Sequence, residues 1–232
     1  MRRRAFVATT ALGVGAAIAA AQAEPAPVPT ASAAPASIGG AVPFHFDKAG
    51  FAAILAKPYP HRQLITAITY AQGESVPHYL ANSLRAYADP KGFAAGPNAL
   101  HCVAVLYGPA IAMVLDDAAW AKYPIGTLTF KDRTKPIAAT SPDIPRTNPL
   151  LGEVTALVTV HDVAFFVCNN AFTGIAASIA KIVDGVDPSR ERIVAVHDDL
   201  ATHLSPGSML VPAGVAAINA VQEAHFTYLP SF

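Results

Sequence analysis

One segment, VAFFVCNNAFTGIAASIAKI at residues 163–182, constrains the fold more than any other. It begins with an apolar run, Val163 to Val167, whose β-branched and aromatic side chains are typical of a buried strand. After Asn170 the sequence changes to an Ala- and Ile-rich pattern typical of a helix. Cys168 therefore lies at the switch from strand to helix.

This position makes Cys168 a candidate nucleophile. Free backbone amides at a helix start carry partial positive charge, so they favour thiolate over thiol and can lower a cysteine pKa well below about 8.5. The alternative is that Cys168 is an inert part of the core, because free cysteine is among the most buried residue types.

Residues 1–23 have the anatomy of a cleaved secretory signal. They contain a basic start (Arg2, Arg3 and Arg4), an apolar stretch and an A-x-A site ending at Ala23. The order R-R-A-F before a weakly hydrophobic, Ala/Gly-rich core resembles a twin-arginine (Tat) signal, so we expect a periplasmic protein. A retained membrane anchor is the alternative, but the apolar run is short, and we expect no membrane span in the mature form.

Residues 24–43 are rich in Pro, Ala and Ser without periodicity, which predicts a disordered linker. Residues 44–232 then fit one folded domain. Removal of the three signal arginines leaves 13 basic side chains against 16 acidic ones. Because the basic residues form no cluster, a nucleic-acid partner is not expected.

Strand and helix patterns alternate along this domain, and the strands are apolar without polar alternation. This predicts an α/β fold: a single-domain, three-layer sandwich with a mostly parallel sheet covered on both faces. Reactive groups collect at the carboxyl ends of strands in such sheets, where Cys168 is expected. The expected strands are 62–70, 101–108, 163–167, 207–212 and 226–230; the expected helices are 46–57, 76–90, 108–123, 149–162, 170–182 and 213–225, with a proline-rich loop at 131–148.

A second cysteine, Cys102, raises the question of a disulfide in an exported protein. Cys102 is expected near the amino end of its strand and Cys168 at the carboxyl end of another. In parallel strands these positions are separated by about 17–20 Å, whereas a disulfide needs Cα atoms within about 7 Å. We therefore expect no bond between them and a core position for Cys102.

No established metal or cofactor motif occurs in the chain. The closest cluster, HDDLATH, holds His197, Asp198, Asp199 and His203, but its spacing is that of no known ligand set, and HDDL reads more simply as a turn and helix start. His161 and Asp162 precede the Cys168 strand at its far end, so neither is expected to act as its base. Dinucleotide, P-loop and α/β-hydrolase signatures are absent, so we expect neither metal nor cofactor.

Four segments together resemble the DsrE/DsrF-like family, and more narrowly its exported members. They are VAVLYGPAIAMVL, TNPLLGEVTALVTVHDV, VAFFVCNNAF and VPAGVAAINAVQEAHFTYLP, and the similarity covers nearly all of residues 61–230. The G-V-A-A-I-x-x-x-Q ending is its most specific part. FFVCNN departs from the small and basic residues that follow the cysteine in the family's sulfur-relay members.

The resemblance implies a compact α/β sandwich in a homo-oligomer, such as a trimer or hexamer, that carries sulfur as a persulfide on Cys168. The sulfur would pass to and from a donor or acceptor protein or a small thiol. In this hypothesis Asn169 and Asn170 stabilise the thiolate, and Tyr107 and Gly108 line the pocket. The alternative is a non-catalytic oligomeric binding or structural module with Cys168 in its core.

Overall fold

A five-stranded, all-parallel sheet organises the protein. The computed structural model describes residues 40–129 and 144–230, which belong to one unit. The strand order is β4-β3-β2-β1-β5. The strands are β1 (His61–Ala67), β2 (Leu100–Leu106), β3 (Ala164–Cys168), β4 (Ser208–Val211) and β5 (Thr227–Pro230).

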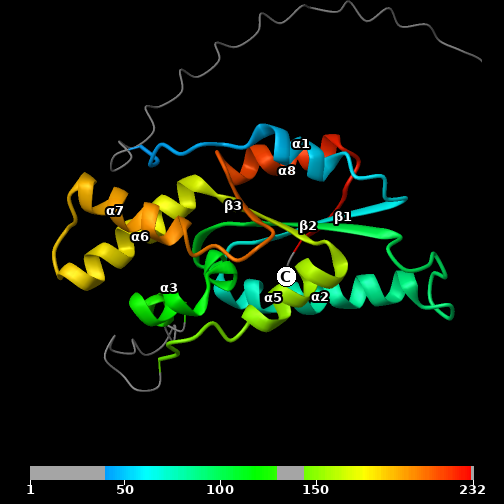
Figure 1. Cartoon of the computed structure of the whole chain (residues 1–232), viewed down its shortest axis with the longest axis horizontal. Helices are drawn as coiled ribbons and strands as arrows, with labels where there is room; N and C mark the ends of the chain where they lie inside the picture. Colours follow the sequence, from blue (N-terminus) through cyan, green and yellow to red (C-terminus); the bar gives the residue numbers. More distant parts are fainter. Residues whose placement is uncertain (1–39, 130–143, 231–232) are drawn as a thin grey trace, which may run out of the picture. The chain divides into compact units, whose positions relative to one another are not determined.

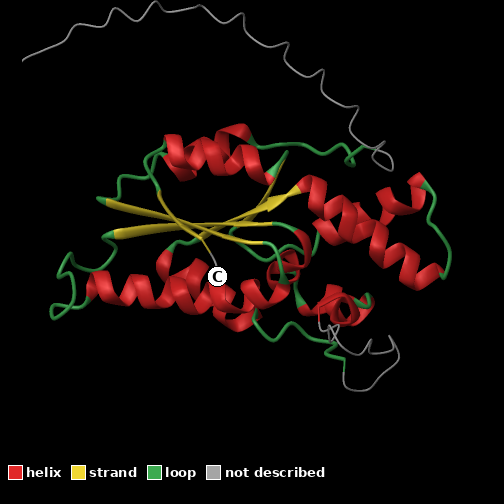
Figure 2. Ribbon diagram, turned by 180° about the vertical axis from the view of Figure 1, so that it is seen from behind, coloured by secondary structure: helices red, strands yellow, loops and turns green. Residues whose placement is uncertain are grey.

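Helices cover both faces of this sheet, so the α/β three-layer sandwich expected from the sequence is confirmed (Figure 1). Figure 2 shows the strands between two helical layers. On one face lie α1 (Lys48–Leu55) and α8 (Gly214–Glu223). The other face carries α2 (Tyr70–Ala88), the 3-10 helix η1 (Gly108–Val114), α3 (Asp117–Lys122), α4 (Ile125–Thr129), α5 (Leu151–His161), α6 (Asn169–Asp184) and α7 (Arg190–Ala201).

Helix α8 lies on the opposite face of the sheet from the helices that connect β1 to β4. The handedness of the connections between parallel strands explains this difference. From β1 to β4 the chain moves across the sheet one strand at a time, with its connections on the face that carries α2. It then returns from β4 to the far edge, where β5 pairs with β1. Since parallel crossovers are right-handed, a connection that runs back must use the opposite face, which is where α8 lies.

The two faces, called here the α2 face and the α8 face, have separate cores. Successive residues of β3 show the division, because alternate side chains point to opposite faces. Phe165 belongs to the larger core of the α2 face. Phe166 belongs to the smaller core of the α8 face and packs on Phe51 of α1, with ring centroids 4.7 Å apart.

The single helix predicted over 108–123 is wrong. A 3-10 helix ends at Val114, Leu115 is extended, and α3 begins at Asp117. Leu115 forms an isolated antiparallel bridge with Leu204, and the Asp116 carboxylate accepts a hydrogen bond from the Ala119 amide at 2.8 Å. The pairing and the cap together break the helix in two.

Other element boundaries moved as well. The predicted strand 62–70 ends at Ala67, and the helix predicted from residue 76 begins at Tyr70, so that Pro77 lies inside it. The interpretation of HDDL as a turn and helix start is wrong. It lies in the C-terminal half of α7, whose N-cap is Ser189.

The folded part begins earlier than the predicted boundary at residue 44. Val42 is buried, its amide donates to the Thr173 hydroxyl at 3.0 Å, and its carbonyl accepts from the Asn169 side chain at 2.8 Å. The predicted signal at 1–23, most of the predicted linker and much of the loop at 131–148 lie outside the described residues. Within the described ranges, no helix combines the length and apolar character needed to cross a membrane.

Candidate functional site

Cys168 lies where the sequence predicts it, at the carboxyl end of β3 and immediately before α6. It is the N-cap residue of α6, and its side chain makes no capping hydrogen bond. Alternation along β3 places the side chain on the α8 face, two positions after Phe166. Only 7% of Cys168 is exposed. The thiol is therefore close to helix-start amides but nearly covered.

The cover comes from the start of α8. A Cβ at Gly214 would overlap the Tyr107 ring and lie 3.2 Å from the Cys168 Cβ. The N-cap of α8, Ala213, offers no side-chain hydrogen bond either. Two uncapped helix starts thus flank Cys168, and both favour negative charge at that point.

A row of hydroxyl groups continues from Cys168 along the carboxyl edge of the sheet. Tyr107 follows β2 directly, Thr66 lies near the end of β1, and Tyr228 lies in β5. The hydroxyl oxygens of Thr66 and Tyr228 are 3.0 Å apart. Four adjacent strands, β3, β2, β1 and β5, therefore each contribute one polar side chain to the same edge.

Tyr107 is the hydroxyl neighbour of Cys168 in this row. Burial raises the pKa of Tyr107 to about 12, with smaller contributions from Tyr228 and Cys168, while a hydrogen bond with Thr66 acts in the opposite direction. The phenol therefore stays protonated at neutral pH, so it can donate a hydrogen bond to an anion but cannot serve as a base.

The other predicted site residues have different surroundings. The Asn169 side chain faces away from the thiol into a buried bridge, where its amide donates to Val42 and its oxygen lies 2.8 Å from Nε2 of His197. Asn170 is exposed. The Asn169 side chain is bonded elsewhere, and stabilisation of a thiolate by the amides of Asn169 and Asn170 stays a prediction.

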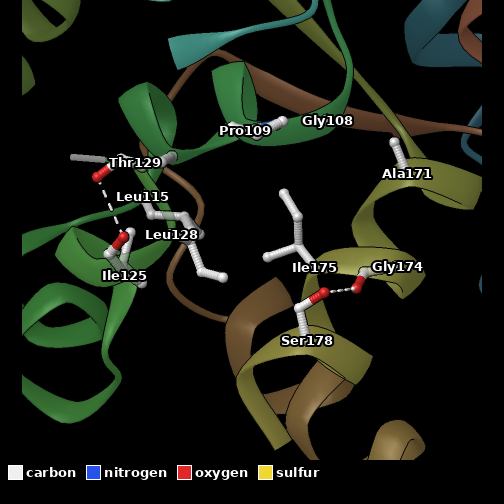
Figure 3. A pocket seen from close by; sticks show the side chains of 11 residues that line it. Gly108, Pro109, Leu115, Ile125, Leu128, Thr129, Ala171, Gly174, Ile175 and Ser178 are labelled. Carbon is white, nitrogen blue, oxygen red and sulfur yellow. Dashed lines mark hydrogen bonds between the residues drawn. The ribbon is translucent and has the colours of Figure 1, made fainter. Parts of the chain in front are cut away.

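Gly108 lines an apolar cavity of about 260 Å³ between η1, α4 and α6 (Figure 3). Ile175 and Leu128 point into this space. Its two hydroxyl groups are already bonded within their own helices, Thr129 to Ile125 and Ser178 to Gly174. Neither Cys168 nor Tyr107 lines this cavity, so it does not join Gly108 and Tyr107 into one pocket beside the thiol.

Cys102 is the core residue that the sequence predicts. Both cysteines are free, which confirms the expectation of no disulfide between them. Cys102 is fully buried, and burial raises its pKa to about 12. Its thiol therefore stays protonated and unreactive at neutral pH.

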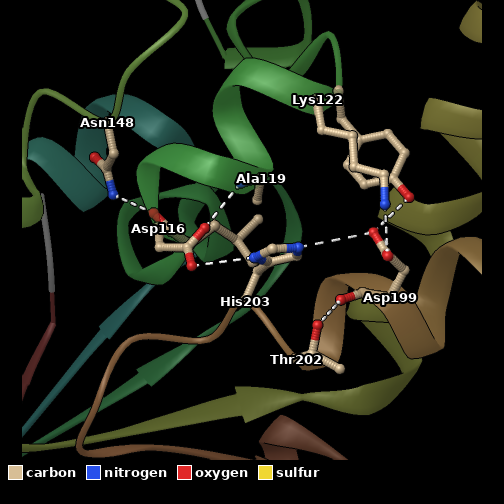
Figure 4. Close-up of polar contacts among 9 residues, drawn as sticks. Asp116, Ala119, Lys122, Asn148, Asp199, Thr202 and His203 are labelled. Carbon is tan, nitrogen blue, oxygen red and sulfur yellow. Dashed lines mark hydrogen bonds and ion pairs between the residues drawn. The ribbon is translucent and has the colours of Figure 1, made fainter.

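The acidic and histidine residues of HDDLATH form local pairs: His197 Nδ1 lies 2.9 Å from Asp198 Oδ1, and His203 Nε2 lies 3.9 Å from Asp199 Oδ2. His203 Nδ1 lies 3.1 Å from Asp116, and Lys122 lies 2.6 Å from Asp199 (Figure 4). Hydrogen bonds from Lys122 and Tyr123 hold the pKa of Asp199 below its usual range. His197 is also buried against Asn169. Among the residues that the structure describes, no group of three or more His, Cys, Asp or Glu side chains could hold a metal ion.

Sequence reasoning missed Gly214, which lies against Cys168, and two members of the hydroxyl row, Thr66 and Tyr228. Thr66 and Tyr228 are the central residues of the predicted strands 62–70 and 226–230, so the local pattern offers no signal that they reach the carboxyl edge. Their proximity to Tyr107 depends on the strand order, in which β5 pairs with β1 across more than 150 residues of sequence. Gly214 starts a predicted helix, but only the return path of α8 brings it to Cys168.

Comparisons with known proteins assign no family to the chain. No family model matches it, and no curated protein matches it. Among solved structures it is similar to MTH1491 from Methanobacterium thermoautotrophicum, a protein of unknown function, with 15% identity and a TM-score of 0.38. The match covers 74% of this chain and 98% of that one. A likeness at this level carries no argument about activity.

Proposed function

We propose that this protein is a periplasmic sulfur carrier of the DsrE/DsrF-like type that acts through Cys168. The observation that carries the proposal is the position of the thiol between the uncapped starts of α6 and α8, beside the protonated phenol of Tyr107. Helix-start amides stabilise a thiolate, and Tyr107 can donate a hydrogen bond to sulfur. The resemblance of the segments around Cys168 and Gly214 to that family supports the same role.

The transfer needs no cofactor and no net oxidation. The Cys168 thiolate attacks the outer sulfur of a persulfide donor R–S–SH, which breaks the donor S–S bond and forms a new one on Cys168. The donor leaves as the thiolate RS⁻, and the proton of its terminal S–H remains with the transferred sulfur. An acceptor thiolate then attacks that outer sulfur and releases Cys168 as thiolate.

Mass spectrometry of the purified mature protein after polysulfide treatment tests this function. We expect added sulfur atoms on the peptide that contains Cys168, and their removal by a small thiol. Cys102→Ser provides the matched control, because its side chain is buried in the opposite core, and this variant should load as the wild type does. Equal loading of Cys168→Ser would reject the proposal.

One observation favours the second candidate, an oligomeric binding or structural module without sulfur chemistry. Cys168 is only 7% exposed, as a core cysteine would be. Thiol labelling of the native protein separates the two candidates, because a carrier cysteine must be reachable by its donor. Labelling that occurs only on global unfolding would favour the module, and size measurements in solution would show whether either candidate is a trimer or hexamer.

A further inference from the structure

His101 is a buried titratable group at the opposite end of the α8 face from Cys168. It belongs to β2, six residues before Tyr107, so the two side chains point to the same face. His101 is fully buried. Neither of its ring nitrogens has a hydrogen-bond partner within residues 40–129 and 144–230. A protonated imidazole has two N–H donors, so this environment tolerates only the neutral ring.

Two chain connections close over this imidazole. Tyr59, between α1 and β1, stacks on it with ring centroids 4.8 Å apart. Phe226, between α8 and β5, meets it edge-on at 5.4 Å. Arg62 ties the same two connections together, because its guanidinium donates to the carbonyl of Ala224 at 2.8 Å and to that of Lys57 at 3.1 Å.

The charges around His101 also oppose its protonation. Lys57 and Tyr59 face it from the α1–β1 connection, Arg62 from β1 and Asp162 from the end of α5. Asp162 is the one anion among them, and it already pairs with Lys57 at 2.6 Å. Burial, followed by the charge of Lys57, lowers the pKa of His101 to about 4, with Asp162 acting in the opposite direction. An imidazolium at this place therefore requires the connections to open.

Helix α8 links His101 to Cys168. Its first residue, Gly214, lies against Tyr107 and Cys168, and the carbonyl of Ala224, directly after its last turn, accepts the hydrogen bond from Arg62. Figure 1 shows α8 lying over the sheet beside α1. Release of the Ala224 end would loosen the helix that covers the thiol.

We propose that His101 is an acid-sensitive latch, whose protonation releases the α1–β1 and α8–β5 connections and uncovers Cys168. The opening itself is independent of what Cys168 does. That this opening regulates sulfur transfer rests on the function proposed above. Falling pH favours the open form between two pKa values: that of an exposed histidine, about 6.5, and the lower pKa of His101 in the closed protein.

Labelling of Cys168 by 4,4′-dithiodipyridine, a disulfide that reacts with thiols in acid, measures the opening in the otherwise unmodified chain. Peptide mass spectrometry assigns the label to Cys168, and a short cysteine peptide corrects for the intrinsic pH dependence. Between pH 7 and pH 4.5 we expect the corrected labelling rate to rise roughly fifty-fold, from the two pKa values above. No rise in the wild type would overturn the latch.

Two variants identify the group that titrates. His101→Phe keeps an aromatic ring between Tyr59 and Phe226 but binds no proton, so its labelling rate should not rise in acid. His225→Asn is the matched control, because His225 is an exposed neighbour of Phe226, and it should behave as the wild type. An undiminished rise in His101→Phe, or loss of the rise in His225→Asn, would contradict the assignment.

Hydrogen exchange of the wild type covers the case in which His101→Phe does not fold. On acidification, peptides from residues 56–62 and 213–230 should lose protection before peptides from α2, whereas a uniform loss would overturn the latch. The two proposals fail separately. Acid opening without polysulfide loading rejects the sulfur function alone, and loading without acid opening rejects the latch alone.

Discussion

The two faces of the sheet differ in what they bury. The α2 face holds a large apolar core that includes Trp120 and Phe165. The α8 face has a smaller apolar core and also carries His101, Thr66 and Cys168 at its two ends. The proposed chemistry and the proposed opening therefore both lie on the face with the thinner helical cover, where movement of a helix would leave the main core closed.

The largest test of this comparison uses two adjacent phenylalanines of β3. Phe165 and Phe166 are both fully buried, but on opposite faces. We expect Phe165→Ala to lower the free energy of unfolding by about 5 kcal/mol and Phe166→Ala by about 3 kcal/mol, because α1 and α8 can relax into the cavity. Urea unfolding measures both values. Equal losses would show that the two faces are equally rigid.

Acid should destabilise the α8 face through His101. Its folded pKa of about 4 lies below the value of about 6.5 in the unfolded chain, so its contribution is complete above pH 6.5 and is lost as pH falls toward 4. We expect roughly 3 kcal/mol of stability to be lost over that range. Urea midpoints measured against pH should show this slope in the wild type but not in His101→Phe; a slope retained in the variant would assign it to other groups.

Gly214→Ala tests how tightly α8 covers the thiol. The added Cβ overlaps the Tyr107 ring, so the ring or the helix must shift, at a cost of about 2 kcal/mol. Gly174→Ala in α6 is the matched control, since a Cβ there meets nothing within 4 Å, and it should stabilise by about 0.5–1 kcal/mol. Thermal unfolding compares them, and a neutral Gly214→Ala would mean that the cover is loose.

The smallest effect should come from the hydroxyl row. Tyr228→Phe removes the hydrogen bond to Thr66 and should cost about 1 kcal/mol. A double-mutant cycle with Thr66→Val, measured by urea unfolding, isolates that bond from the other changes. A coupling energy of zero would show that Thr66 and Tyr228 do not interact, and would contradict the hydroxyl row as described.

The sequence predicts those parts of the fold that depend on local pattern. Apolar runs identify all five strands, and the strand-to-helix switch places Cys168 correctly. Helix α7 was missed although Ser189 supplies an N-cap signal, because its apolar residues are few and its acidic HDDL segment resembles a turn. The break at Leu115 depends on a partner, Leu204, that no local pattern reveals.

The surroundings of the site depend on long-range order and were correspondingly harder to predict. Nothing near His101 in the sequence shows that Tyr59 and Phe226 will enclose it, or that its nitrogens will lack partners. The meeting of Gly214 with Tyr107 and Cys168 follows from the return of the chain over the α8 face. Such contacts require the strand order, which single-sequence periodicity does not contain.

The return crossover also sets an order of folding. Strand β1 is an interior strand only after β5 has paired with it, and β5 lies at the C-terminal end of the described chain. During synthesis β1 therefore remains an open edge with unpaired amide and carbonyl groups until β5 has been made. Within one segment, residues 213–230, α8 covers Cys168 and β5 closes that edge, so completion of the sheet and protection of the thiol depend on the same part of the chain.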